Sequence, residues 1–366
     1  MFRIAQIEIL PIVIPLKKPV MMAGASVHEA ENVVIRLTDQ DGTVGWGEAA
    51  SAPMMNGETQ AGMVAACEHM IDRLCGAEVP DLAAIPALVD AAIVGNPGAK
   101  SAIEMALLDL IGQKTGLPLY ALLNKAERPR ASVLTFVAGG TLEEEIAHAR
   151  AMVDGGYVAL KVKIGLAGVE KDLARCAAVR AAVGSGIRIS ADANGGYARA
   201  DALAFVAGAV DAGLDFVEQP VSPGDMEGMR ACAAATPVPI AADEGLKSID
   251  AIRRHHELGA AAGGSIKTIK LGGCMAVMDA GHLMQGLDMQ VNLAGKTAET
   301  SIASAAIAHL GIALPQVNWD VSVTSSYLAT DVVSDPIGPR HGHVTAPERP
   351  GLGIDVDEGL LSKLRL

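Results

Sequence analysis

The feature that most constrains this chain is a regular alternation of short apolar segments with alanine-rich helical segments, which begins near Val133. Polar residues end the apolar segments at intervals of 24 to 29 residues. They are Lys163, Asp192, Glu218, Asp243, Lys267 and Asn292. One strand, one helix and two loops take up about 30 residues. Seven or eight such units in a row therefore predict a closed barrel of parallel strands.

Eight barrel strands are predicted, at residues 132–136, 159–164, 188–191, 216–218, 240–242, 265–269, 290–293 and 317–320. The runner-up architecture is an open doubly wound sheet, whose first strand normally leads into a GxGxxG turn. The sequence contains no GxGxxG motif. In a parallel barrel the carboxyl ends of all strands face one mouth, where catalytic groups gather.

Residues 1–128 have a different sequence pattern, which predicts a separate α+β domain. Apolar residues alternate along 4–14, 33–37 and 44–48, with an Asp41-Gly42 turn before the last run, which is typical of an antiparallel sheet. Helices are predicted at 61–74 and 99–114. Gly116 and Pro118 stop the second helix. We expect the barrel to occupy residues 129–339.

The charge balance excludes some partners. The 29 basic and 42 acidic residues give a net charge of −13, and no basic run exceeds two residues, which argues against nucleic acid. Five cysteines without a CxxC pair and an N-terminus without a signal segment predict a cytoplasmic protein. The uncharged stretch 300–319 divides into a helix and a short strand, so no membrane association is expected.

Three acidic residues, Asp192, Glu218 and Asp243, end successive predicted strands. One such residue would be interpreted as solvated or as a helix cap, but three at matching offsets would repel one another in a dehydrated mouth. A hard divalent cation removes that repulsion, and an all-oxygen ligand set suits Mg²⁺, with Mn²⁺ as a possible replacement. Asn194 and Glu244 are expected to support these ligands rather than to bind the metal.

Lysines end the strands on either side of these carboxylates. Lys161 and Lys163 share one strand face, and Lys267 lies four strands away in a ring of about eight, across the barrel. The two lysines repel each other and are repelled by a nearby cation. We expect both effects to lower the pKa of at least one of the two ammonium groups. Lys270 lies an odd number of residues after Lys267, so along a strand its side chain would point to the opposite face. It is expected to face a helix or solvent. Two opposed amines can remove an α-proton from one face of a carboxylate substrate and return one to the other.

With these motifs in order, the chain resembles the enolase superfamily and, within it, the muconate lactonizing enzyme subgroup of the mandelate racemase/muconate lactonizing enzyme family. The resemblance rests on VGWGEA at 44–49, the helix at 101–120, KVK, DAN, EQP, ADE, IKxxKLGG and the terminal PGLGIDVDE. It implies a modified TIM barrel, (β/α)₇β, with an N-terminal α+β capping domain that the tail, residues 340–366, rejoins. It also implies a homo-oligomer.

The resemblance assigns roles to the strand-end residues. Asp192, Glu218 and Asp243 would hold Mg²⁺, and Lys163 and Lys267 would act as acid and base. Lys161 would steady the substrate carboxylate. The pairing of a lysine base with Mg²⁺ is a known pattern of this superfamily.

Substrate-contacting residues are harder to assign. The resemblance implies that a loop, segment 21–30, closes over the mouth, where His28 is the one evident side chain to recognise a polar group of the substrate, and it places Glu299 near the site. Trp319 and Asp320 end the presumed last strand. Dipeptide epimerases of this subgroup show Asp-x-Asp there for a substrate ammonium, whereas this chain has Asp320-Val321-Ser322. The ring of Trp319 or Phe136 could instead face an N-substituted or quaternary ammonium, but a role in the core is favoured for either aromatic side chain.

The sequence therefore predicts an isomerase acting on a small-molecule carboxylate through an enediolate intermediate. Racemisation or epimerisation of a small amino-acid derivative is the first hypothesis. The alternatives are a cycloisomerase of the muconate lactonizing type, a dehydratase acting on a hydroxy acid, and a noncatalytic metal-binding barrel.

Overall fold

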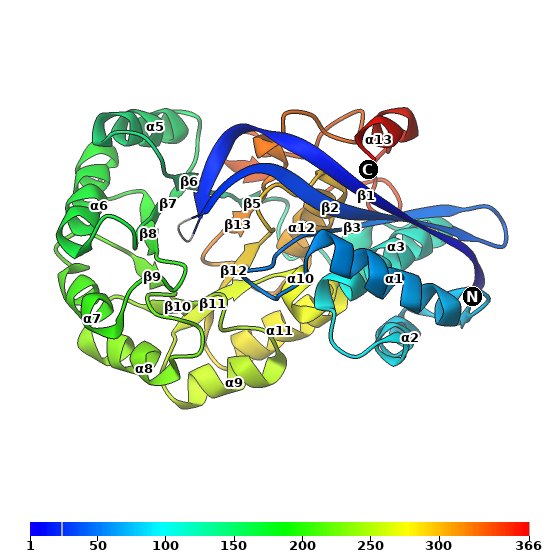
Figure 1. Ribbon diagram of the computed structural model, residues 1–366, viewed down its shortest axis with the longest axis horizontal. Coiled ribbons are helices and arrows are strands. Elements are labelled where there is room, and N and C mark those ends of the chain that lie inside the picture. Colours follow the sequence, from blue (N-terminus) through cyan, green and yellow to red (C-terminus); the bar gives the residue numbers. More distant parts are fainter. Residues whose placement is uncertain (23–24, 366) are drawn as a thin grey trace.

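The computed structural model describes residues 1–22 and 25–365 and contains an eight-stranded parallel barrel (Figure 1). A bridge between Val133 and Val321 closes the ring of strands. In their order around the ring, the strands are β6 (Leu134–Val137), β7 (Ala159–Lys163), β8 (Arg188–Asp192), β9 (Phe216–Glu218), β10 (Ile240–Ala242), β11 (Gly263–Ile266), β12 (Gln290–Ala294) and β13 (Val321–Ser322). The barrel predicted from the repeat is confirmed.

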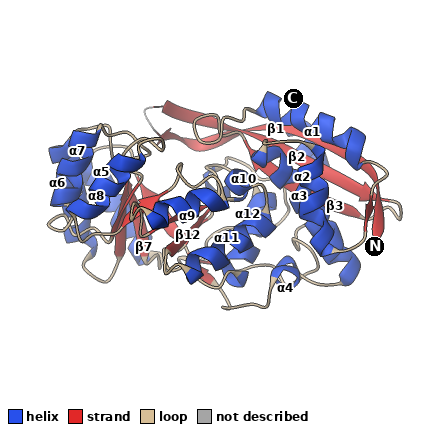
Figure 2. Ribbon diagram, turned by 90° about the horizontal axis from the view of Figure 1, so that it is seen from below, coloured by secondary structure: helices blue, strands red, loops and turns tan. Residues whose placement is uncertain are grey.

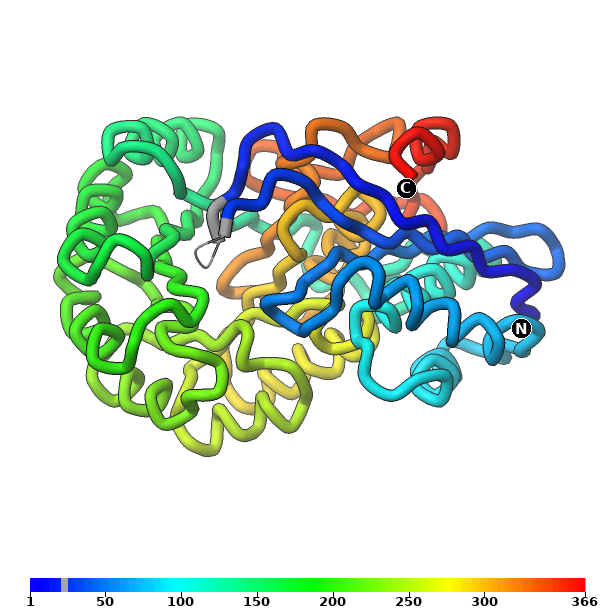
Figure 3. The backbone as a smooth tube through the Cα atoms, viewed as in Figure 1, coloured from blue at the N-terminus to red at the C-terminus, as the bar shows by residue number. Residues whose placement is uncertain are grey.

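Helices between the strands form the outer layer of the barrel (Figure 3). They are α5 (Leu142–Asp154), α6 (Val169–Val183), α7 (Arg199–Gly208), α8 (Met226–Ala235), α9 (Ile249–Glu257), α10 (Thr268–Leu271), α11 (Cys274–Gly286) and α12 (Ser301–Ala313). Local sequence explains several helix starts. Thr141 and Glu144, for example, form a reciprocal capping box at α5. No helix among the described residues is long and apolar enough to cross a membrane.

The N-terminal α+β unit covers one side of the barrel (Figure 2). Its antiparallel sheet has the order β3-β2-β1-β4. The elements are β1 (Phe2–Met22), β2 (Ala25–Asp39), β3 (Val44–Ala50), α1 (Gln60–Leu74), β4 (Glu78–Val79), η1 (Leu82–Ala84), α2 (Ile85–Ala92), α3 (Pro97–Thr115) and α4 (Leu119–Leu123). The predicted stop of α3 is confirmed, because Gly116 follows it in the left-handed conformation with φ 72°.

The C-terminal tail returns to the N-terminal unit. Asp109 on α3 is buried and accepts hydrogen bonds from the backbone nitrogens of Trp46 at 2.8 Å and Leu352 at 2.7 Å. The remaining short elements are β5 (Ala131–Ser132), η2 (Ser325–Tyr327), β14 (His343–Val344), which pairs with β5, and α13 (Glu358–Leu364). One buried carboxylate therefore joins β3, α3 and the tail.

Two buried carboxylates of the N-terminal unit fasten it to the barrel. Glu48 on β3 accepts hydrogen bonds from Thr300 N at 2.9 Å, Thr300 Oγ1 at 2.6 Å and Ala303 N at 3.0 Å, at the start of α12. Glu104 on α3 accepts from Cys274 N and from Met275 N at the start of α11. Carboxyl oxygens at helix N-termini accept hydrogen bonds from backbone donors that have no partner within the helix.

Three local predictions were wrong. The last strand begins at Val321, after the predicted segment 317–320. The sixth strand ends at Ile266, and residues 268–271 form α10 rather than strand. Segment 21–30, expected as a loop, belongs largely to the long β1–β2 hairpin, and its residues 23–24 lie outside the described chain. Short strands have weak local signals, so propensity alone did not fix their ends.

We predict that Gly47→Ala destabilises the protein through a clash with α3. A Cβ atom at Gly47 would run into the carbonyl oxygen of Ala102 and the nitrogen of Ala106, both backbone atoms of a buried helix. The unfolding free energy in urea should fall by about 1–3 kcal/mol. Gly186→Ala is the matched control, because open space surrounds that position. Equal stability of the two variants would contradict this packing.

Candidate active site

The three predicted metal-binding carboxylates lie side by side at the carboxyl ends of adjacent strands. In the parallel ladder, Asp192 is the partner of both Lys163 and Glu218, and Glu218 is the partner of Ala241, two residues before Asp243. All three carboxylates are buried. Because residues two apart share a strand face, the register directs all three toward one mouth.

Each carboxylate is bonded to a lysine ammonium. Lys163 Nζ lies 2.6 Å from Asp192 Oδ2, and Lys161 Nζ contacts Glu218 Oε2. Lys267 Nζ lies 2.8 and 2.6 Å from the two carboxylate oxygens of Asp243. Lys267 comes directly after β11, four strands around the eight-strand ring from β7. The predicted opposition of the two lysine strands is thus present in the structure.

Lys270 is an unexpected member of this cluster. The sequence predicted that it faces a helix or solvent, but its side chain is buried and its ammonium lies 2.7 Å from Asp243 Oδ1 and 2.7 Å from Ser265 O. The prediction was wrong because it assumed that the strand, with its alternating side chains, continued past Ile266. The chain turns there into α10, and one helical turn returns residue 270 to the side of residue 267.

Burial and ion pairs shift the pKa values of the cluster in opposite directions. Burial alone would raise the pKa of Asp243, but Lys267 and Lys270 hold it well below its usual range. Burial would lower the pKa of Lys267, yet Asp243 and Glu244 outweigh that effect and raise it. The pKa of Lys161 is likewise raised, against the cost of burial, by Glu218. Burial lowers the pKa of Lys270.

The carboxylate oxygens of Asp192, Glu218 and Asp243 are suitable ligands for Mg²⁺, although they point toward the lysines in this structure. Among the described residues, no three His, Cys, Asp or Glu side chains are arranged around a common point as a ready metal site. The buried carboxylates nevertheless repel one another, since Asp192 and Asp243 both contribute to a raised pKa at Glu218, after burial itself. A set of carboxylate oxygens without nitrogen or sulfur ligands fits a hard cation.

Neighbouring polar groups hold the strand ends in place. Gln219 Oε1 accepts from the backbone nitrogens of Asp243 at 2.9 Å and Gly245 at 3.2 Å. Asn194 Oδ1 accepts from Lys163 Nζ at 2.9 Å, and its amide donates to Glu244 Oε1 at 2.9 Å. Asn194 thus contacts Lys163 of the cluster, and Glu244 contacts Asn194, which agrees with the supporting role expected of both residues. Burial raises the pKa of Glu244 to about 7.

Two hydrophobic side chains border the lysines. The ring centroid of Phe136 lies 4.9 Å from Lys163 Nζ, so its face meets an ammonium of the chain itself. Met55 Sδ, in the segment after β3, lies 3.9 Å from Lys267 Nζ. No sequence pattern pointed to Met55, because only the docking of the N-terminal unit brings that segment to the barrel.

Trp319 and Asp320 lie away from the mouth. Since the last strand starts at Val321, both residues precede it, at the amino-terminal end of the barrel. Trp319 stacks on Phe216 with ring centroids 4.2 Å apart, inside the barrel. Asp320 accepts from Ser132 Oγ and from Arg188 Nη1, and Arg188 is the first residue of β8. The structure therefore does not bring either residue to the candidate site.

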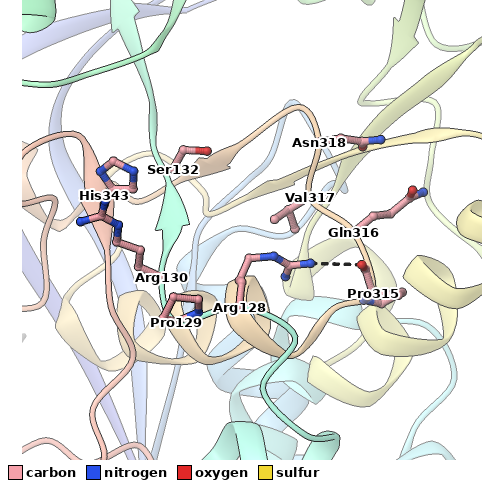
Figure 4. Close-up of a pocket in the computed structure, with 9 residues that line it drawn as sticks. All are labelled: Arg128, Pro129, Arg130, Ser132, Pro315, Gln316, Val317, Asn318 and His343. Carbon is pink, nitrogen blue, oxygen red and sulfur yellow. Dashed lines mark hydrogen bonds between the residues drawn. The ribbon is translucent and has the colours of Figure 1, made fainter.

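A pocket of about 520 Å³ opens at that same amino-terminal end (Figure 4). Its lining includes Ser132, His343 and Arg128. The guanidinium of Arg128 donates to the carbonyl oxygens of Gly311, Leu314 and Pro315, at 2.7, 2.8 and 3.1 Å. This arginine caps the end of α12. The pocket lies at the end of the barrel opposite Asp192, Glu218 and Asp243, so it is not the candidate active site.

The remaining predicted contacts lie near the mouth or on the hairpin. Glu299 is buried in the loop after β12, and burial raises its pKa to about 8. Lys296, three residues earlier, was missed by the sequence analysis. His28 is exposed on β2, with Nε2 3.0 Å from Ser26 Oγ. Contact of His28 or Glu299 with substrate stays a prediction.

Comparison with known proteins places this geometry in a family. Residues 4–124 match the family described as mandelate racemase / muconate lactonizing enzyme, N-terminal domain, and residues 144–360 match the enolase C-terminal domain-like family. The L-Ala-D/L-Glu epimerase of Bacillus subtilis (strain 168) is 31% identical over 358 residues, 96% of each chain. The N-succinyl-L-Arg/Lys racemase of Bacillus cereus is 30% identical over 372 residues, covering 99% of this chain and 98% of the racemase.

A solved structure agrees with these sequence relatives. The muconate lactonizing enzyme from Pseudomonas fluorescens, complexed with muconolactone, superposes with a TM-score of 0.94 at 29% identity, and each chain is covered completely.

We predict that Asp320→Asn lowers stability, because Asp320 has a structural role at the amino-terminal end of the barrel. The loss of a buried carboxylate from Ser132 and Arg188 should reduce the unfolding free energy by about 1–3 kcal/mol, measured by urea denaturation. Asp335→Asn is the control, because Asp335 forms an exposed ion pair with Arg340. Its cost should stay below about 0.5 kcal/mol. An Asp320 variant as stable as the control would count against this placement.

Proposed function

Since this chain belongs to the mandelate racemase/muconate lactonizing enzyme family of the enolase superfamily, and is an isomerase, we propose that it racemises or epimerises a small carboxylate substrate by moving its α-proton between Lys163 and Lys267. The alternative of a noncatalytic metal-binding barrel is thereby rejected. The observation that carries the proposal is the position of these lysines on opposite strands of one ring, each bonded to a carboxylate of the same cluster.

In the proposed reaction, one lysine begins as a neutral amine and the other as an ammonium. The amine of Lys163 takes the α-proton from one face of the substrate, which leaves an enediolate. The ammonium of Lys267 then gives a proton to the opposite face. After the reaction the two lysines have exchanged protonation states, and the reverse sequence converts the other enantiomer.

Lys161 is proposed to bind the substrate carboxylate. Its ammonium is buried and bonded to Glu218, and the neighbouring carboxylates raise its pKa against burial, so it carries a positive charge at neutral pH. A fixed charge beside the substrate carboxylate stabilises the second negative charge that α-proton loss creates.

We propose that Asp192, Glu218 and Asp243 hold Mg²⁺. When bound, Mg²⁺ would stabilise the enediolate charge and offset the carboxylate field that raises the pKa of Lys267. The three carboxylates must then exchange some of their lysine contacts for the cation.

The lysine assignment predicts opposite stereochemical defects for two variants. With a panel of N-acyl amino acids and dipeptides in D₂O, the wild-type protein should exchange the α-hydrogen of both stereoisomers, measured by ¹H NMR. Lys163→Met should lose exchange from one stereoisomer and Lys267→Met from the other, each by about 10²-fold or more. Circular dichroism confirms that the variants fold. Full retention of both activities in either folded variant would contradict the assignment.

The metal assignment predicts a stabilisation that depends on Glu218. Mg²⁺ that binds only the folded protein raises its melting temperature with concentration. This increase should occur in the wild-type protein and disappear in Glu218→Gln, measured by differential scanning fluorimetry after chelator treatment. Glu68→Gln, at an exposed position on α1, should respond like the wild-type protein. An unchanged response of Glu218→Gln would refute this ligand.

The second candidate is cycloisomerisation, which the full-length similarity to the muconate lactonizing enzyme favours. That reaction uses the same enediolate, but only one lysine exchanges a proton with the substrate carbon. Loss of ultraviolet absorbance of cis,cis-muconate, without racemisation of any amino-acid derivative, would favour this candidate over the first.

A further inference from the structure

The loop that follows Lys163 is fixed by a buried carboxylate on the next helix. Lys163 ends β7, and Gly165 in the loop after it donates its backbone N–H to Asp172 Oδ2 at 2.9 Å. Asp172 lies in the first turn of α6 and is completely buried. Gly165 has a φ of 95°, and a Cβ atom there would lie 3.1 Å from the carbonyl oxygen of Ala193. The loop therefore packs directly against the loop that follows β8.

The same carboxylate oxygen also binds the loop after β8. Tyr197 donates its hydroxyl to Asp172 Oδ2 at 2.7 Å, and both side chains are buried. Tyr197 comes three residues after Asn194, whose Oδ1 accepts from Lys163 Nζ at 2.9 Å. Asp192, at the end of β8, accepts from the same Nζ at 2.6 Å. One oxygen atom thus joins the loop after Lys163 to the loop that carries the acceptors of its ammonium.

The Asp172 carboxylate is itself held from the outer layer of helices. Its Oδ1 accepts from Arg175 Nη1 at 2.9 Å. Arg175 in turn donates two hydrogen bonds to the buried carboxylate of Glu145 on α5, at 3.0 and 2.7 Å. A bidentate arginine–carboxylate pair has a defined geometry. Helices α5 and α6, neighbours in the outer layer (Figure 1), therefore fix the orientation of the oxygen that binds both loops.

The other proposed acid/base residue, Lys267, lies outside this network. Lys267 follows β11, across the ring from β7, and its ammonium contacts Asp243 and Met55. Within residues 1–22 and 25–365, the side chains of Asp172 and Tyr197 form no hydrogen bond with β11 or α10. Loss of the Tyr197 hydroxyl should therefore disturb the surroundings of Lys163 and leave those of Lys267 in place.

We propose that Tyr197 and Asp172 are positioning residues for Lys163, which hold its loop so that the Lys163 amine meets one face of the substrate at reacting distance. This inference rests on the proposed function and assigns a support to one of the two opposed lysines. Neither Tyr197 nor Asp172 is assigned a contact with substrate. A displacement of about 1 Å at a reacting group can slow a reaction by about 10²-fold, so a loosened loop has a measurable effect.

The variant Tyr197→Phe tests this inference, because it removes only the hydroxyl. Exchange of the α-hydrogen in D₂O is followed by ¹H NMR for each stereoisomer separately. With the stereoisomer whose exchange requires Lys163, kcat should fall about tenfold and KM should stay within about twofold of the wild-type value. With the stereoisomer whose exchange requires Lys267, kcat should fall by less than about twofold.

Two further variants serve as control and confirmation. Tyr157→Phe removes a hydroxyl from a half-buried tyrosine just before β7, at the opposite end of that strand, and should act on both stereoisomers like the wild-type protein. Asp172→Asn has one acceptor oxygen where the carboxylate has two, so it should show the same defect on one stereoisomer only. Adding Tyr197→Phe to Asp172→Asn should slow that stereoisomer by less than about twofold more, because both changes act through one contact.

A purely structural role of Tyr197 gives a different result. Loss of stability or a distorted barrel would slow exchange of both stereoisomers to a similar extent in Tyr197→Phe, and that outcome overturns the inference. Wild-type rates of Tyr197→Phe with both stereoisomers also overturn it.

Failure of the inference can be distinguished from failure of the proposed function by a measurement without substrate. Hydrogen–deuterium exchange of the backbone amides of residues 164–168, followed by mass spectrometry, should be about fivefold or more faster in Tyr197→Phe than in the wild-type protein and in Tyr157→Phe. If the wild-type protein exchanges the α-hydrogen of no substrate, the proposed function fails. Faster amide exchange then still supports the fixing of the Lys163 loop by Tyr197, whereas unchanged amide exchange overturns the inference.

Discussion

The candidate site depends on the compensation of buried charge at the mouth of the barrel. Three carboxylates removed from water would each cost several kcal/mol without a partner. Lys161, Lys163 and Lys267 supply those partners. Lys161, Lys163 and Lys267, which are proposed to act on substrate, are therefore each also bonded to a carboxylate proposed to bind metal. Binding of a cation and the protonation of the lysines must be coupled for that reason, since both involve the same carboxylate oxygens.

The N-terminal unit completes this site from outside the barrel. Glu48 and Glu104 bind the backbone at the starts of α12 and α11, and both carboxylates have a pKa raised by burial. Met55 reaches Lys267 from the same unit. The barrel strands thus supply the groups proposed to react, whereas the docked unit fixes a loop and a side chain that border them. Because the two contributions come from separate elements, the groups that border the site can change without a change in the groups proposed to react.

Much of the fold and of the central site could be predicted from sequence. A strand repeat of 24 to 29 residues specifies a parallel barrel. Because alternate residues of a strand point to the same face, Asp192, Glu218 and Asp243 lie on one face. Lys270, Asp320 and Trp319 were misplaced because β11 and β13 begin and end at other residues than predicted. A shift of a few residues moves a side chain to the other face or to the other end of a strand, so strand-end errors affect function more than fold.

The sequence by itself determined the order of the strands and the residue types at their carboxyl ends, because both follow from local periodicity. Only the tertiary structure decided which charges meet. The turn into α10 brings Lys270 to Asp243, docking of β3 fixes the loop of Lys296 and Glu299, and the late start of β13 pairs Asp320 with Arg188. These contacts join residues from 27 to 252 positions apart. No local pattern encodes such separations, since they depend on how complete elements pack against one another.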